Sequence, residues 1–281
     1  MHWISIPEYD IHVGLNQAYR PVLLTNEDDL MFTSNPFADL TVFLPPQAMQ
    51  VYIVLMIFAV VIGTVADMIH KRSGQYFIQR QKKLKADATR VLSGADKASL
   101  AVKTIVVEVA TAGEFCNPQR RISHMLMFYG FLFYLGTTVV MIFGYPTHAT
   151  PIPSSIPLLW NIGILMLMIG GYWFFFLLRV NVVRDGQPVF RLVLADLFIV
   201  TLLGSVTFAF IWAIVQSTGN LTATKISFGL YLLFTTLLFG TVRWSKLAHM
   251  FFKPVVAFQR RVEEASGASS LPAPATRNER S

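Results

Sequence analysis

Two of the six histidines follow basic residues by one helical turn, and this pattern is the part of the sequence best suited to chemistry. The first group is Arg120, Arg121 and His124, and the second is Arg243, Lys246 and His249. Two neutral imidazoles can ligate opposite faces of a b-type haem, and nearby cations pair with the haem propionates. The pattern predicts one haem b, with His124 and His249 as iron ligands, if the fold brings both to the same depth.

The single cysteine, Cys116, narrows the cofactor chemistry further. It excludes an internal disulfide framework, a zinc site built from cysteines and an iron–sulfur cluster held by this chain alone. The sequence has no CxxCH motif for covalent haem attachment, and no Walker A, GxSxG or HExxH motif. These absences exclude a covalently attached c-type haem and remain compatible with a non-covalently bound haem.

The composition indicates that lipid surrounds the elements carrying these histidines. Hydrophobic residues make up 54% of the chain and charged residues 14%, against about 25% in soluble domains. Five apolar stretches reach the roughly 20 residues that a membrane-spanning helix needs. They cover residues 48–69, 122–145, 157–180, 192–216 and 226–250. We expect an all-α integral membrane protein with a five-helix transmembrane bundle, in which Gly136 and Gly170-Gly171 are close-packing positions.

The distribution of Lys and Arg sets the expected orientation. The segment 70–121 contains eleven basic residues and the tail from residue 243 contains seven, whereas residues 1–47 contain one basic and six acidic residues. With three further arginines in the loop 179–191, one side of the membrane receives 21 basic residues, and the other receives two. We therefore expect an outer N-terminus and a cytoplasmic C-terminus in a multi-pass protein of the bacterial inner membrane. The net charge of +7 reflects this excess of basic residues on the cytoplasmic side, and no nucleic-acid partner is expected.

This orientation places His124 in the first cytoplasmic turn of the second span and His249 in the last turn of the fifth. The alternative is that both are interfacial histidines at the level of the lipid headgroups, with no ligand. His70 lies at the same level and could replace either ligand, although its position is typical of a span boundary. His148 is expected in an outer loop, either as an ordinary loop residue or in contact with a quinone headgroup.

The remaining segments have distinct compositions. Residues 1–47 form an acidic outer arm, residues 70–121 a basic, partly helical cytoplasmic loop, and residues 251–281 a cytoplasmic tail expected to be disordered from about 265. Within the loop, the KTIVVEV run is apolar enough to lie against the bundle or against a partner. The chain has no internal repeat and no chain of buried acids and bases, so a channel or transporter is disfavoured.

Two motifs give the chain a family resemblance over about residues 48–260. The sequence RISH ends at His124 and is followed by FYGF, and SKLAH ends at His249 and is followed by Lys253-Pro254. With five spans, these motifs resemble the nitrate reductase gamma-subunit family of cytochrome b membrane anchors. Relatives with two haems carry a deeper histidine on spans two and five, where this chain has Tyr134 and Tyr231. The resemblance therefore implies a single haem on the cytoplasmic side.

Within that family, the short chain without a cluster-binding domain is most similar to the membrane anchor of adenylylsulfate reductase in sulfur-oxidising bacteria. The resemblance implies a soluble flavin and iron–sulfur enzyme that docks on the cytoplasmic face and oxidises sulfite. The chain would anchor this enzyme and pass its electrons to quinone, bound near Arg243, Lys246 and His249. The alternative is an anchor without haem and with a purely structural role. The charge of the 70–121 loop suits an acidic partner and anionic lipid equally.

Overall fold

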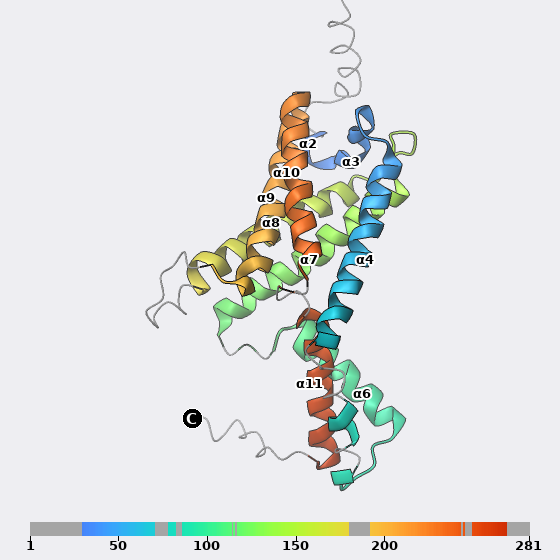
Figure 1. Cartoon of the computed structure of the whole chain (residues 1–281), viewed down its shortest axis with the longest axis vertical. Coiled ribbons are helices and arrows are strands. Elements are labelled where there is room, and N and C mark those ends of the chain that lie inside the picture. The colour runs from blue at the N-terminus through green and yellow to red at the C-terminus, as the bar shows by residue number, and fades with distance from the viewer. Residues whose placement is uncertain are drawn as a thin grey trace, which may run out of the picture. The chain divides into compact units, whose positions relative to one another are not determined.

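The described part of the chain is built from helices, five of them long and apolar enough to cross a membrane (Figure 1). The structure, a computed structural model, describes residues 30–70, 78–82, 86–113, 115, 117–179, 192–242, 244 and 249–268. The long helices are α4 (Pro46–His70), α7 (Pro118–Gly144), α8 (Ser155–Trp173) with its π-helical extension η3 (Phe174–Leu178), α9 (Leu197–Ser217) and α10 (Leu221–Gly240). The described residues contain no strand, and the predicted all-α, five-helix membrane fold is confirmed.

Shorter helices precede, connect and follow the spans. They are α2 (Leu30–Thr33), α3 (Pro36–Asp39), η1 (Leu40–Val42), α6 (Gly94–Thr104), the π-helix η2 (Ile105–Ala110), η5 (Leu194–Asp196) and α11 (His249–Ser266). Local capping explains several starts. Ser93 and Asp96 form a reciprocal capping box at α6, and the two Ser93 hydrogen bonds lower the pKa of the Asp96 carboxyl. The Asn35 side chain accepts from the Phe37 amide at the start of α3.

The fifth long helix is displaced from the range expected from the sequence. It begins at Leu221, where Asn220 accepts from the Ala223 amide at 3.1 Å, and it ends at Gly240. A turn follows, in which the Trp244 amide donates to the Thr241 carbonyl at 3.0 Å. His249 therefore begins the separate helix α11 and does not lie in the last turn of a span over 226–250. Glycine is a weak helix former, so Gly240 is a favourable place for the helix to end.

The described chain divides into two compact units, each containing part of every long helix. Unit 1 consists of the described residues within 1–54, 129–168 and 202–235, and unit 2 of those within 55–128, 169–201 and 236–281. The core of unit 1 is aromatic. Trp160 and Trp212 are both fully buried, with ring centroids 6.2 Å apart and nearly perpendicular planes. Large aromatic side chains bury much apolar surface and prefer such edge contacts, which stabilises this unit.

Helices α7 and α8 approach each other closely at glycines. In unit 1, a Cβ added to Gly163 would lie 2.7 Å from the Tyr134 backbone nitrogen. In unit 2, a Cβ on Gly170 would lie 2.8 Å from Leu126 Cβ, and the Ser123 hydroxyl donates to the Gly170 carbonyl at 2.8 Å. Small residues of this kind allow membrane helices to pack backbone to backbone. The expectation for Gly170 is thus confirmed, whereas that for Gly136 is wrong, because nothing lies within 4 Å of its Cβ position.

A bidentate ion pair links two segments of unit 2. The Arg179 guanidinium donates to both carboxylate oxygens of Asp196, at 3.1 and 2.5 Å, and both side chains are mostly buried. Arg179 also lies over the Phe175 ring, 5.0 Å from its centroid. Paired geometry of this type compensates the cost of removing both charges from water. It explains how an acidic residue is accommodated directly before the apolar helix α9.

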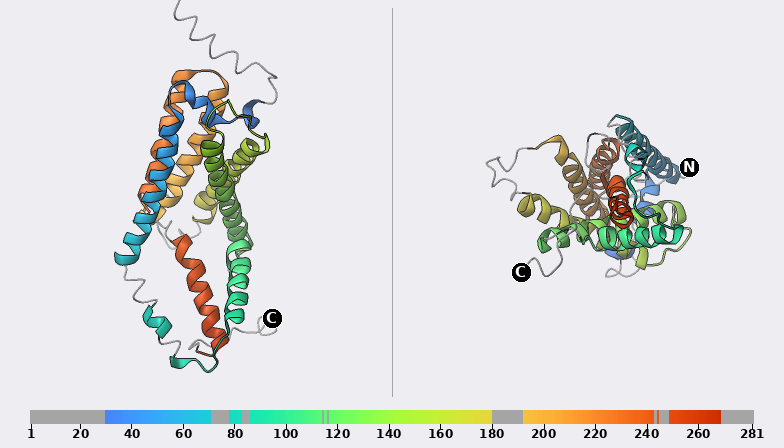
Figure 2. Two further views of the ribbon diagram at one scale, coloured as in Figure 1. Left: turned by 90° about the vertical axis from the view of Figure 1, so that its right-hand side faces the viewer. Right: turned by 90° about the horizontal axis from the view of Figure 1, so that it is seen from below.

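The helices α6 and η2 run alongside α11 within unit 2 (Figures 1 and 2). Thr89, which precedes α6, donates to the carbonyl of Ser266 at the end of α11 at 3.0 Å. Arg80 forms a bidentate pair with Glu263 of α11 at 2.6 and 2.7 Å, and the Glu263 side chain is buried. Residues 70–121 are thus partly helical. The start of the tail, as far as Ser266, forms the helix α11, which packs against α6 and η2.

Candidate functional site

His124 lies in the second turn of α7, and its position follows from how that helix begins. Asn117 accepts from the Gln119 amide at 2.9 Å, and Pro118 occupies the first helical position, where its missing N–H costs nothing. The imidazole of His124 is half-buried. Arg120 and Arg121 lie one turn earlier on α7, and both are exposed to solvent. As expected from the spacing, the two arginines precede His124 by one helical turn.

Phe115 connects His124 to α11. Its ring contacts the His124 imidazole with centroids 5.1 Å apart, and the Lys253 ammonium lies 5.1 Å from the Phe115 centroid. Lys253 follows His249 by four residues in α11, so the two positions share one face of that helix. The second turn of α7 and the first turns of α11 therefore converge at Phe115. No local pattern in the sequence marked Phe115, because its role depends on two helices distant along the chain.

The structure describes the other three predicted site residues only in part or not at all. Arg243 and Lys246 fall outside the described residues. The backbone of His249 is described as the first residue of α11, but its side chain is not. The structure thus brings together His124, its two arginines and the helix that carries His249.

The donor set of this region suits a b-type haem. Imidazole nitrogen is the usual axial ligand of haem iron, a half-buried aromatic ring suits the porphyrin face, and exposed arginines suit the propionates at the water interface. The Phe115 ring packs against the His124 imidazole. Against this, α10 ends at Gly240, so His249 is carried by a different helix from the one expected.

The two tyrosines named in the sequence analysis lie in the aromatic core of unit 1. Tyr134 and Tyr231 are 3% and 2% exposed. Tyr134 stacks on Trp160 with centroids 6.1 Å apart, and Tyr231 stacks on Trp212 at 5.6 Å. Their rings belong to the aromatic core that stabilises the unit.

Asp67 is a buried acidic residue that the sequence analysis missed. It lies one turn before the end of α4, in unit 2, and is 2% exposed. An acidic residue within an otherwise apolar span is the signal that could have identified it.

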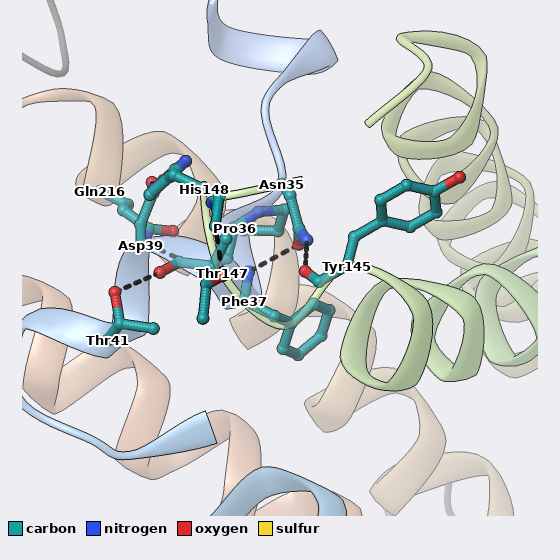
Figure 3. A network of polar contacts seen from close by, with 11 residues as sticks. Asn35, Pro36, Phe37, Asp39, Thr41, Tyr145, Thr147, His148 and Gln216 are labelled. Carbon is teal, nitrogen blue, oxygen red and sulfur yellow. Dashed lines mark hydrogen bonds and ion pairs between the residues drawn. The ribbon is translucent and has the colours of Figure 1, made fainter. Parts of the chain in front are cut away.

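The end of the N-terminal arm is packed into unit 1 through a polar network (Figure 3). The Asn35 amide donates to the Tyr145 carbonyl at 2.7 Å, and the Gln216 amide donates to the Pro36 carbonyl at 3.0 Å. Phe37 packs edge-on against both core tryptophans, with centroid distances of 5.8 Å to Trp160 and 5.2 Å to Trp212. Residues 35–40 are therefore a structural part of this unit.

His148 belongs to the same network. Its Nε2 lies 2.8 Å from Asp39 Oδ1, across the contact between the α7–α8 loop and α3 (Figure 3). The hydrogen bond to Asp39 raises the pKa of His148, against a smaller opposing effect of burial. The ion pair gives this loop histidine a structural partner within unit 1.

The His148–Asp39 pair predicts a pH-dependent stability. Because the pKa of His148 is higher in the folded chain, its stabilisation is complete below the pKa of the unfolded state, about 6.5, and is lost as the pH rises through the folded value. The melting temperature in detergent should therefore fall more between pH 6 and pH 9 for the native chain than for His148→Gln. A full pH dependence retained in His148→Gln would contradict this assignment.

Comparison of the chain with family models, curated proteins and solved structures found no match.

Proposed function

We propose that this chain is the membrane anchor and electron-transfer subunit of a quinone-reactive oxidoreductase complex in the bacterial inner membrane. The observation that carries the proposal is the convergence at Phe115 of the His124 turn of α7 and the first turns of α11. It gathers an imidazole, exposed cations and the helix of a second histidine at one end of unit 2. The positive-inside asymmetry supports a cytoplasmic location for this end.

In this proposal one haem b is held by His124 and His249. Arg120, Arg121, Arg243 and Lys246 supply the positive charge for its propionates. A bound haem supplies one-electron transfer between a soluble donor and quinone. In the chain itself the His124 imidazole contacts Phe115, and Arg120 and Arg121 are exposed to solvent.

The proposed partner is a soluble flavin and iron–sulfur enzyme on the cytoplasmic face, of the adenylylsulfate reductase class. In that reaction sulfite and AMP give adenylylsulfate and two electrons, which reduce quinone to quinol with uptake of two protons. The motifs ending at His124 and His249 support this class by resemblance. The basic residues of the 70–121 loop support an acidic docking partner.

A second candidate function is a haem-free docking anchor for the same enzyme. The end of α10 at Gly240 favours it, because His249 begins a separate helix and does not end a membrane span. The two candidates share the fold and the partner, and they differ only in the cofactor.

Absorption spectra of the purified chain distinguish the two functions. Protein expressed with ample haem and purified in mild detergent should show a sharp reduced α-band after dithionite. A pyridine haemochrome assay should give about one haem per chain, as expected for one pair of axial histidines. A featureless spectrum would contradict electron transfer by this chain and favour the structural anchor.

A further inference from the structure

The helices α6 and η2 expose an apolar surface that the proposed function does not use. Ala98, Val102, Ile105 and Val106, here called the α6 stripe, follow the spacing of one helical face. Val102, Ile105 and Val106 are 61%, 58% and 50% exposed, and Ala98 is also exposed. Thr104, on another face of α6, is buried at 2% exposure. The helix pair formed with α11 therefore leaves the stripe uncovered.

Positive charge borders the α6 stripe. Lys97 and Lys103 lie beside it on the same helix, and both are exposed. The acidic residue of α6, Asp96, is engaged by Ser93 in the capping box at the helix start. The stripe thus has an apolar centre and a cationic border, which is the anatomy of a protein–protein contact with a polar rim.

We propose that the α6 stripe is the surface on which an acidic face of the soluble redox enzyme docks. This inference rests on the proposed function and assigns its partner contact. Aliphatic side chains at the centre would be desolvated by the enzyme, and Lys97 and Lys103 would pair with its carboxylates. The stripe is short, so it forms one part of a larger interface of at least about 1,000 Å².

Two other occupants fit the stripe less well. A membrane-surface helix places Trp or Phe on its apolar face and leaves its opposite face in water. The α6 stripe has no aromatic residue, and the helix packs along α11. A symmetric second copy would bring like-charged Lys97 and Lys103 borders together, which is unfavourable.

The test uses the full chain in nanodiscs of zwitterionic phosphatidylcholine and purified soluble adenylylsulfate reductase as the probe. The double variant Val102→Ser/Ile105→Ser should raise the dissociation constant roughly tenfold, as loss of an interface centre does. Lys103→Glu should also weaken binding and reduce its dependence on salt. Val91→Ser is the matched control, because Val91 is 93% exposed but precedes α6 and is not part of the stripe. The affinity of this variant for the enzyme should equal that of the native chain.

The outcomes separate this inference from the function on which it rests. If the native chain does not bind the enzyme, both are overturned. If it binds and the stripe variants bind equally well, or the Val91→Ser control loses as much affinity, only the stripe assignment is overturned.

A second measurement tests lipid as the occupant. An environment-sensitive fluorophore attached to Val102→Cys, in a Cys116→Ser background, should report water without the enzyme and shielding after its addition. Shielding already present in anionic vesicles without enzyme would overturn the proposal and assign the stripe to the membrane.

Discussion

His124→Ala should abolish the reduced haem spectrum of the purified chain, and His249→Ala should do the same. Each substitution removes one of the two imidazoles that the proposal assigns to the iron, and alanine supplies no ligand in its place. Haem content should fall from about one per chain to below about a tenth. Loss of a residue that only hydrogen-bonds to a metal ligand already lowers metal affinity by about 10–100-fold, and loss of the ligand itself should have at least this effect. The measurement is the pyridine haemochrome content of protein purified in equal amounts.

Folding of these variants must be separated from haem loss. His124 is half-buried within an α-helix, and alanine is the best helix former, so His124→Ala should insert and elute as the native chain does. His70→Ala is the matched control, because His70 ends α4 and is exposed. It should keep the full spectrum. A full spectrum in His124→Ala or His249→Ala would remove that residue from the ligand pair and make His70 the candidate.

Gly163→Ala should strongly destabilise unit 1. The added Cβ would lie 2.7 Å from the Tyr134 nitrogen and 2.9 Å from the Gly130 carbonyl oxygen. Both neighbours are backbone atoms of α7, so relief requires the two helices to separate and not merely a side-chain rotation. Overpacking of this kind costs about 1–3 kcal/mol. The melting temperature in detergent should fall, and the buried Trp160 should report the change by fluorescence.

Gly136→Ala is the matched control for this substitution. Gly136 lies on α7, and nothing is within 4 Å of its Cβ position. Alanine there should raise helix stability by up to about 1 kcal/mol, so the two variants should shift the melting temperature in opposite directions. Equal decreases in both would contradict the close approach at Gly163.

Some of this fold is determined locally and was therefore predictable from the sequence. Backbone groups in lipid must be hydrogen-bonded within the segment, so a long apolar run can only be a helix, and five such runs gave five helices. Asn117 and Pro118 similarly determine where α7 begins, and hence the turn that carries His124. These signals depend on neighbours a few residues away.

Other features were decided by contacts between segments far apart along the chain. Gly136 and Gly163 both lie within apolar spans, and only the close approach of a second helix at Gly163 distinguishes them. Phe37 belongs to a polar-rich arm, yet it is buried and packs edge-on against Trp160 and Trp212. Phe115 matters because α7 and α11 meet there.

The sequence by itself thus determined the helical class and the five apolar spans, because hydropathy acts within one segment. It placed His124 in the first turn of a span starting at residue 122, whereas α7 begins at Pro118 and carries His124 in its second turn. The tertiary structure alone decided the burial of residues 35–40, the close glycine contacts, the separation of His249 from α10 and the exposed α6 stripe. The physical reason is that burial and close packing are properties of pairs of segments. Periodicity within one segment leaves its partner undetermined.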